Sequence, residues 1–472
     1  MNVASSSATR VPIERRGIDY VPAEERHGRP ASLFTLWFAS NVQVTALATG
    51  ALAVVLGLNF GWAVGAILIG NLAGGLFMAY HSAQGPRLGI PQMIQSRAQF
   101  GMFGALLPLA VVVCIYGGFF ITSAILGGQA IASLLHIPLL GGLVIADAIS
   151  LLLAWVGYDL IHRWARFSTV VSGIIFVVLT IKLITIAHLS YKAPAVTGGA
   201  VLLVISIIAS WQLTWAPYVS DYSRYLPEKT PAGKTFWYTY LGSALGGSWL
   251  MILGALAATV AANAISADAP GYLSALFGSG WTWLFLLVFI VGLQAANVEN
   301  LYGGFMVVTT AISPSGKIAP GWLMRLIWTS FFAVAGTVIG YYASVHFLTN
   351  LINFLVFLLY LIVPWTAINL TDYYLIRRGN YSIPDIFKVT GRYGVVNWLA
   401  VGVFVLTVLI ELPFMNSAIY VGPISHRLGD ADIAWIVGLI VAGGLYYIAA
   451  RAGLHTRAAA GAGPGETAEA TT

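Results

Sequence analysis

The chain has 472 residues, of which 58% are hydrophobic and only 8% are charged. Ordinary soluble domains carry about 25% charged residues, so this composition excludes a soluble globular protein and predicts an all-α polytopic membrane protein. The formal net charge of +6 does not indicate a nucleic-acid partner, because the basic residues lie between the apolar runs.

Twelve apolar runs follow one another along the chain, and each predicts a transmembrane helix. The expected spans are 33–56, 62–81, 104–133, 138–157, 168–188, 200–222, 236–263, 281–311, 323–343, 347–376, 395–415 and 432–450. With a cytoplasmic N-terminus, 20 of the 23 Lys and Arg residues fall on the cytoplasmic side, and only Lys182, Lys192 and Arg427 fall outside. This bias follows the positive-inside rule. We therefore expect two cytoplasmic termini and a cell (plasma or inner) membrane location.

The two ends of the chain differ in character. Residues 1–30 predict a cytoplasmic N-terminal tail, in which Ile18, Tyr20 and Val21 can pack under the bundle. Residues 451–472 are small and polar, and they are expected to form a disordered cytoplasmic tail.

The loop after span 2, Gly85–Gly104, mixes glycine, proline and two arginines with large apolar residues. A cytoplasmic loop that only connects two spans does not need large apolar residues. We therefore expect an amphipathic segment that lies against the bundle, with the plain connector as the alternative.

The sixth span is interrupted near its end, in the stretch Ala209–Tyr225 (ASWQLTWAPYVSDYSRY). Pro217 removes a backbone donor, and open backbone in hydrocarbon is tolerated only where it is buried in protein or lines a watery cavity. A helix broken near Thr214–Pro217 is therefore typical of a transporter site at mid-membrane. The alternative is a proline-kinked helix with interfacial tryptophans.

The first span is also interrupted, by the polar residues Ser40, Asn41, Gln43 and Thr45. The two interrupted spans are the first and the sixth, so they lie five spans apart. This spacing predicts an inverted repeat of five plus five helices. The halves share no residue-level similarity, so this prediction depends on position alone. The predicted units are 31–190 for the first repeat, 200–376 for the second, and 395–450 for two extra C-terminal helices.

Several stretches of the chain resemble nucleobase–cation symporter family 1, the permeases for cytosine, purines, uracil, thiamine and allantoin. They are GIDYVPAEERHG before span 1, WFASN (Trp37–Asn41), GPRLGIPQMIQSRAQFG after span 2, SDYSRYLP (Ser220–Pro227) and, more weakly, NVENLY (Asn297–Tyr302). The resemblance implies the five-plus-five fold first described for bacterial amino-acid symporters, with broken helices 1 and 6. It also implies a substrate held between spans 1, 3, 6 and 8, so that Ser40 and Asn41 are candidate contacts.

A nucleobase is a flat heterocycle with hydrogen-bonding groups on its edge, so its site needs aromatic faces and polar partners. Trp215 lies six residues before Asp221, as in the purine–cytosine members, and is the first candidate for a stacking wall. Trp211 is the alternative, and Gln212 between them can bond the ring edge. Asp221 either bonds the substrate or ties the end of span 6 to Arg224.

Span 3 is expected to supply the second wall. Many relatives have a tryptophan there, followed four residues later by an amide. Aligned on Gly127–Gln129, this chain has Phe119 and Ser123 at those positions. Phenylalanine can still stack, but serine has a shorter arm than an amide, and Tyr116 is a neighbouring substitute. Plain helix packing is the alternative for Phe119, and the departure leaves the identity of the substrate open.

Span 8 carries four polar residues in an otherwise apolar helix. Asn297 and Asn300 share a face with Gln294 at i, i+3 spacing. We expect one of the two asparagines to contact substrate, with interhelical hydrogen bonding as the alternative. Glu299 points away from that face, and intramembrane acids are usually functional. It either carries the coupling proton or pairs with a buried polar residue.

The coupling ion is expected to be a proton rather than sodium. Sodium in this fold needs carbonyls and hydroxyls, but Ala295-Ala296 stands where sodium-coupled relatives tend to have Ser or Thr, and Thr309 and Thr310 are far along the helix. Glu299 or Asp221 would then titrate. Neither a resident metal nor a cofactor is expected.

Two further acids lie within the spans. Asp147 in span 4 is expected to form a structural pair. Glu411 in span 11 lies outside the repeat and is also expected to be structural.

The sequence thus favours a symporter, not an enzyme, that imports a nucleobase or related heterocycle with a proton. The alternative is a sodium-coupled permease for allantoin, a hydantoin or another heterocycle. An integral membrane enzyme is less consistent with the sequence. The eight histidines of the chain lie near span ends and lack the spacing of metal ligands. A channel would need repeated filter sequences or oligomeric symmetry, which one chain cannot show. The expected partners are the small-molecule substrate, the cation and the bilayer.

Overall fold

The computed structural model describes residues 19–156, 158–187, 196–312 and 322–453. Within them every predicted span coincides with a helix or a pair of helices, and the only β-structure is an isolated bridge between Asn416 and Val421. The span helices are α1 (Ala31–Asn41) with α2 (Val44–Val55), α3 (Phe60–Ser82), α6 (Leu106–Leu135), α7 (Leu139–Val156), α8 (Tyr158–Ile186), α9 (Gly198–Leu213) with η2 (Ala216–Tyr218) and α10 (Val219–Ser223), α11 (Ala232–Ala275), α12 (Ser279–Ile312), α13 (Trp322–Ala343), α14 (Phe347–Leu370), α16 (Trp398–Glu411) and α18 (Ala434–Arg451).

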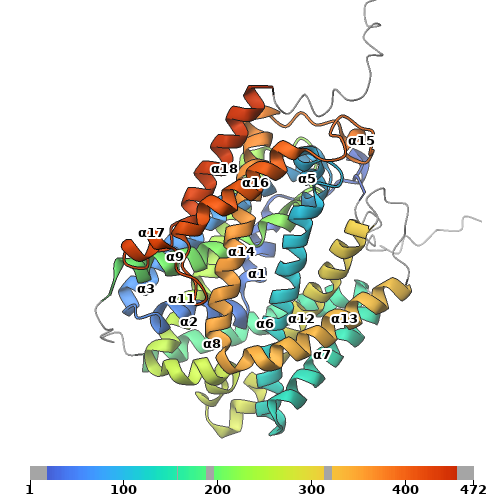
Figure 1. Cartoon of the computed structure of the whole chain (residues 1–472). Coiled ribbons are helices and arrows are strands. Elements are labelled where there is room, and N and C mark those ends of the chain that lie inside the picture. The colour runs from blue at the N-terminus through green and yellow to red at the C-terminus, as the bar shows by residue number, and fades with distance from the viewer. Residues whose placement is uncertain (1–18, 157, 188–195, 313–321, 454–472) are drawn as a thin grey trace, which may run out of the picture.

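Shorter elements connect these helices. They are η1 (Ala23–Glu25), α4 (Gly85–Leu88), α5 (Gln92–Phe100), η3 (Ser344–His346), η4 (Thr371–Ile376), α15 (Ile383–Ile386), η5 (Leu412–Phe414) and α17 (Pro423–Arg427). The long helices run beside one another, and α5 and α15 lie together at one end of the bundle (Figure 1).

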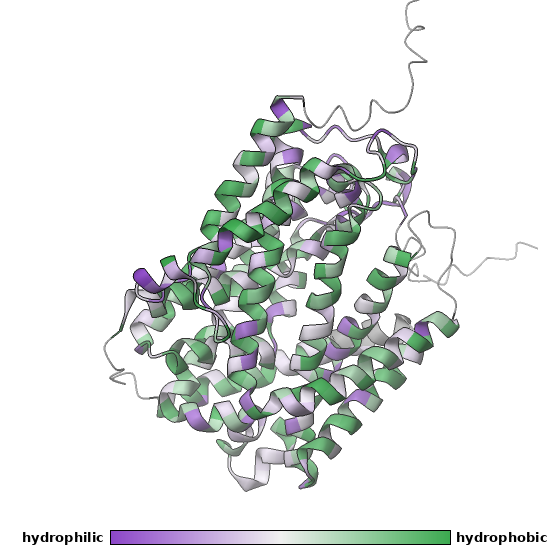
Figure 2. Ribbon diagram, in the orientation of Figure 1, coloured by the Kyte–Doolittle hydropathy of each residue, from purple (hydrophilic) through white to green (hydrophobic). Residues whose placement is uncertain are grey.

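Length and apolar composition identify eight membrane-crossing helices among the described residues, or nine when the bent pair α1–α2 counts as one span. That count takes Trp322–Ile376 as one helix, where we predicted two spans, and sets aside Leu139–Trp155 and Trp398–Phe414 as shorter apolar helices. The twelve predicted spans are therefore all apolar helices. Hydrophobic residues dominate the long helices, and hydrophilic residues gather mainly in the connections (Figure 2).

Both predicted breaks are present. The α1–α2 pair bends by 63°, and between the two helices Gln43 is extended, with φ −148° and ψ 158°. In span 6, α9 ends at Leu213, and after two turn residues the chain continues as the short η2, which contains Pro217. The proline cannot donate to the preceding turn, so the helix is interrupted where the sequence predicts.

The broken spans lie beside each other. The indole Nε1 of Trp211 donates to Oδ1 of Asn41 at 2.7 Å. Span 7 was predicted at 236–263, and its helix kinks close to that end: the backbone is non-helical at Ala261 and again at Asp268, and further helical residues follow as far as Ala275.

Helices α2 and α11 pack closely through small residues. All side chains from Val44 to Val54 are buried. A Cβ placed on Gly254 would lie 1.8 Å from the carbonyl oxygen of Leu47, and one on Gly50 would lie 2.0 Å from that of Met251. Membrane helices gain little from the hydrophobic effect on pairing, so small residues that let backbones approach are used instead.

We therefore expect Gly254→Ala to destabilise the fold by about 1–3 kcal/mol, the usual cost of overpacking, because the backbone atoms it meets cannot move aside. The thermal midpoint in detergent measures the effect. The matched control is Gly65→Ala on α3, where an added Cβ meets nothing within 4 Å. Equal midpoints for the two variants would contradict the close packing.

The segment after span 2 differs from its prediction. It lies against the bundle as expected, but every residue of α5 is buried, so the segment is enclosed rather than amphipathic. The reason is a cover that the local sequence does not reveal. The residues after span 10 fold over it, and Ile386 and Tyr393 pack in one cluster with Ile90 and Ile94.

The N-terminal tail packs under the bundle from residue 19 onward. The Val21 amide donates to the Gly89 carbonyl at 2.9 Å, and Val21 is fully buried. Arg26 Nη1 donates to the Pro86 carbonyl at 2.6 Å. Tyr20 is exposed instead of packed, and Ile18 lies outside the described residues, as does the predicted disordered tail beyond residue 453.

Candidate functional site

An aromatic cluster surrounds the break in span 6. The ring of Trp215 lies 5.8 Å from that of Trp37, 6.4 Å from Trp211 and 6.0 Å from Tyr218, always edge to face. Trp215 is half-buried, and its Nε1 has no hydrogen-bond partner in the described part of the chain. Tryptophan N–H groups usually find a partner when buried. Trp215 therefore presents both a large aromatic surface and an unused donor.

The span-3 wall faces this cluster. Phe119 makes edge contacts with Trp211 at 5.4 Å and with Phe354 at 5.2 Å. Tyr116, one turn earlier on α6, lies 5.0 Å from Tyr218. Residues three and four apart share a helix face, so one face of α6 contacts the broken part of span 6.

Span 8 carries an amide without a hydrogen-bond partner among the residues described. Asn297 is fully buried, and neither its amide nitrogen nor its amide oxygen is bonded. Gln294, which precedes Asn297 by three residues on α12, lies beside Gly127 of α6. Because α6 and α12 run antiparallel, Asn297 falls near the level of Ser123, which is also buried. Asn300 follows on α12 and is half-buried.

Glu299 lies on the other side of α12 from Asn297, and its side chain is exposed. Gly303, one turn further on, lies against the ring of Tyr116. Tyr116 is within electrostatic range of both Glu299 and Asp221. Glu299 therefore lies within electrostatic range of Tyr116 on α6, on the side of α12 away from Asn297. Intramembrane acids usually face the bundle interior or a watery cavity.

Gln212 has other partners than those we predicted. Its Nε2 donates to Oδ1 of Asn71 at 2.6 Å, and its Oε1 accepts from the hydroxyl of Ser243 at 2.5 Å. With donor and acceptor both engaged, Gln212 links span 6 to spans 2 and 7 behind the site. A contact with a ring edge would require these bonds to break.

The span-1 candidates also make internal contacts. Asn41 accepts from Trp211 and donates to Ser243 Oγ at 3.0 Å, so it holds Trp211 in position. Ser40 donates to the carbonyl of Leu36 at 2.9 Å and is half-buried. These contacts give Asn41 an indirect role and leave Ser40 near the break.

Asp221 holds the neighbouring segment. One of its carboxylate oxygens accepts from the backbone N–H of Gln92, at the start of α5, at 2.8 Å. Arg224 Nε donates to the main-chain carbonyl of Asp221 at 3.2 Å. The acid therefore joins the end of span 6 to the loop after span 2, which adds a role to the two that we considered.

The other hydroxyls and acids that we considered within the spans differ in their contacts. Thr309 and Thr310 donate to carbonyls of their own helix at 2.9 Å. Asp147 accepts from Thr337 of α13 at 2.5 Å, the kind of structural pair expected. Glu411 is buried, and neither oxygen has a partner in the described ranges. Those ranges hold no group of three His, Cys, Asp or Glu residues placed to bind a metal.

Sequence reasoning did not single out Trp37 and Tyr218. Trp37 is buried, and its Nε1 has no partner in the chain as described. Both residues carry a signal in retrospect, because Trp37 opens the WFASN stretch and Tyr218 lies three residues after Trp215.

The profile of a family described as permease for cytosine/purines, uracil, thiamine, allantoin matches residues 20–438. A Bacillus subtilis protein with the provisional name purine-cytosine permease YxlA is 44% identical over 94% of this chain and 98% of that protein. The purine-cytosine permease fcyB of Emericella nidulans is 27% identical over 92% of this chain and 88% of that protein. The vitamin B6 transporter TPN1 of Saccharomyces cerevisiae is 26% identical over 78% of this chain and 66% of that protein.

Solved structures share the fold. The inward-facing conformation of Mhp1 matches with a TM-score of 0.75 at 19% identity, covering 94% of this chain and 96% of that chain. Mhp1 in a closed conformation with bromovinylhydantoin bound, described as a nucleobase-cation-symport-1 family transporter, gives a TM-score of 0.70 at 19% identity, covering 93% and 95%. The five-plus-five fold with broken helices 1 and 6 is therefore confirmed. The repeat boundaries at 31–190 and 200–376 stay predictions.

Proposed function

The chain belongs to the family of permeases for cytosine/purines, uracil, thiamine and allantoin, and we propose that it imports a purine, cytosine or closely related heterocycle together with a proton. Two of its relatives carry the name purine-cytosine permease, and they match almost its whole length. We propose a plasma or inner membrane location with both termini in the cytoplasm, in keeping with the distribution of basic residues.

The observation that carries the substrate class is the unpaired amide of Asn297. A buried polar group without a partner costs about 1–3 kcal/mol, so such a group in a membrane helix suggests a ligand that supplies the partner. A nucleobase edge presents a donor and an acceptor side by side, which matches the donor and acceptor of one amide.

The aromatic residues suit a flat ring. Trp215 and Phe119 both make edge contacts with Trp211. Stacking on an aromatic side chain contributes about 1–3 kcal/mol per base in nucleic-acid binding proteins. Phe119 and Ser123 are smaller than the tryptophan and amide of many relatives, so we propose a site with more room on the span-3 side.

A proton is the coupling ion that we propose. Glu299 is an ionisable group with an exposed side chain within a membrane-spanning helix, while the nearby helix positions that a sodium site would need are alanines, Ala295 and Ala296. Removing a carboxylate from water disfavours its charged form, so a carboxyl that alternates between two water-filled sides can take up and release a proton.

Uptake of labelled compounds tests the proposal directly. Cells that express the chain are given cytosine, adenine, hypoxanthine, uracil, allantoin, a hydantoin and pyridoxine in turn. We expect saturable uptake of a purine or cytosine, and competition by unlabelled base. Uptake of allantoin, the hydantoin or pyridoxine alone would overturn the nucleobase assignment.

Trp215→Ala should weaken substrate binding by about 1–3 kcal/mol, since it removes the stacking surface. Trp215→Phe should restore part of the loss. The affinity is measured by competition binding to membranes. Trp398→Ala removes a tryptophan that is 73% exposed and distant from the site, and it should leave affinity unchanged. Equal affinities for Trp215→Ala and the wild type would place the stacking surface elsewhere.

A further inference from the structure

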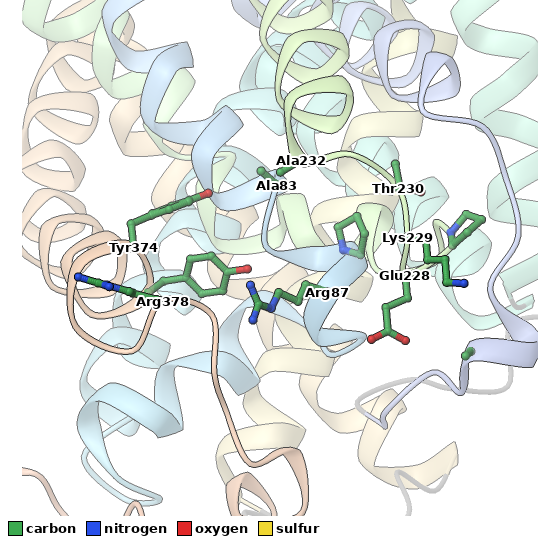
Figure 3. A pocket seen from close by; sticks show the side chains of 12 residues that line it. Ala83, Arg87, Glu228, Lys229, Thr230, Ala232, Tyr374 and Arg378 are labelled. Atoms are coloured by element: carbon green, nitrogen blue, oxygen red, sulfur yellow. The ribbon is translucent and has the colours of Figure 1, made fainter.

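A pocket of about 910 Å³ lies at one end of the bundle, apart from the site described above. Figure 3 shows Arg87 between a wall with Tyr374 and Arg378 and a loop with Glu228 and Lys229. Three cations and one carboxylate thus line the pocket, which gives it an excess of positive charge. Its walls come from four parts of the chain: the N-terminal tail, the α3–α4 junction, the loop before α11, and η4 with the residues after it.

The pocket borders a group of aromatic side chains on lipid-facing helices. Tyr374 donates its hydroxyl hydrogen to the carbonyl of Tyr80 on α3 at 2.8 Å. The Tyr80 ring lies 4.9 Å from that of Phe236 on α11. Tyr80 and Trp237 are 40% and 56% exposed. Exposed tyrosine and tryptophan on spanning helices mark the level of the lipid headgroups, so the pocket opens at the membrane–water interface.

The pocket also lies on the side of the membrane where anionic lipids are found. Arg87 follows span 2, Lys229 follows span 6 and Arg378 follows span 10, and the positive-inside rule assigns all three connections to the cytoplasm. The structure brings these connections together around one pocket. The cytoplasmic leaflet is rich in anionic lipid, and basic pockets between membrane helices bind its headgroups.

One of the three cations is held in place by the fold. Arg87 Nη2 donates to Oδ1 of Asn380 at 2.8 Å, and its guanidinium lies against Gly379, whose φ of +73° suits glycine. Arg378 has a φ of +52°, which is uncommon for a residue with a side chain. The guanidinium of Arg87 is therefore positioned before a ligand arrives.

We propose that this pocket binds the phosphate headgroup of an anionic phospholipid, with the acyl chains along the exposed faces of α3 and α11. A soluble phosphate compound has the same charge, but it gains nothing from the exposed aromatic side chains beside the opening. The carboxylate of Glu228 works against the anion. The proposal is independent of the transported substrate.

Native mass spectrometry of the full chain tests this binding. The protein in detergent is mixed with equal amounts of phosphatidylglycerol and phosphatidylcholine, and retained lipid is counted. We expect phosphatidylglycerol to be retained in preference. Lys229→Gln and Arg378→Gln should each weaken its retention about five-fold, since a basic group near an anionic lipid surface contributes about that factor. Glu228→Gln should strengthen retention, because it removes the repulsive charge.

Lys388→Gln is the matched control, because Lys388 is exposed in the connection after span 10 but does not line the pocket. It should retain phosphatidylglycerol like the wild type. Equal retention of the two lipids, or no difference between the Lys229, Glu228 and Lys388 variants, would overturn the site. Displacement of the lipid by inorganic phosphate would overturn the lipid assignment and indicate a site for a soluble anion.

Discussion

Asn297→Leu should weaken substrate binding about 10- to 100-fold and leave the protein without substrate as stable as the wild type, or more stable. The side chain is similar in volume, but it has no donor or acceptor for a ring edge. The amide of Asn297 is buried without a partner in the described residues, so its replacement removes an unsatisfied group at no cost in bonds. A substrate whose edge is left unpaired should bind at least 10- to 100-fold more weakly, a loss of about 1.5–3 kcal/mol. Thermal midpoints with and without substrate, together with competition binding, measure both effects.

The same experiment separates a substrate contact from an interhelical hydrogen bond. If Asn297 bonds a neighbouring helix, Asn297→Leu should lower the midpoint of the empty protein. The control is Gln294→Leu on the same helix, whose side-chain oxygen accepts from Ser150 at 2.5 Å. That variant removes this bond between α7 and α12 and leaves Ser150 only the carbonyl of Ala146, at 3.0 Å, on its own helix, so it should be destabilised. A midpoint for Asn297→Leu that falls as far as that of Gln294→Leu would refute the substrate contact.

The fold could be predicted from the sequence to a large extent, because each determinant is local. Apolar runs of sufficient length specify spans, and Pro217 in one span and polar residues in another specify the breaks. The burial of α5 could not be predicted, because its cover comes from Ile386 and Tyr393, almost three hundred residues away in the sequence.

The candidate site was harder to predict than the fold. Gln212 and Asn297 are both amides in interrupted or polar stretches, and their types do not distinguish them. The structure does, because Gln212 bonds Asn71 and Ser243, whereas Asn297 has no partner among the described residues. The partners of Gln212 belong to other spans, so no local pattern reveals that the amide is engaged. Residue type therefore identifies candidates, and long-range contacts decide between them.

The same contacts suggest how the two broken spans stay aligned. Asn41 of span 1 bonds Trp211 of span 6 and Ser243 of span 7, and Ser243 also bonds Gln212. Buried polar networks whose members are all bonded rigidify a core. This network lies behind the aromatic cluster around Trp215, so it supports the wall against which a ring would stack.

Glu299→Gln should leave substrate binding within about two-fold of the wild type and abolish accumulation against a gradient. The amide has the same shape but cannot take up or release a proton. The side chain of Glu299 is exposed and lies within electrostatic range of Tyr116, whereas Asn297 is buried on the opposite side of α12. Removal of the charge should therefore disturb coupling more than binding. In the wild type, uptake should rise as external pH falls, because a more acidic medium protonates the carboxyl more often. A protonophore should lower uptake.

The measurement is uptake at fixed pH in sodium and in choline medium, followed by the pH series for each variant. Exchange of sodium for choline should change wild-type uptake little. Glu411→Gln makes the same substitution at a buried acid on α16, outside the repeat, and it should keep the pH dependence. If wild-type uptake is lost in choline medium and does not depend on pH, the proton is not the coupling ion. In that case the cation would have to be bound by oxygen ligands such as the backbone carbonyls at the breaks.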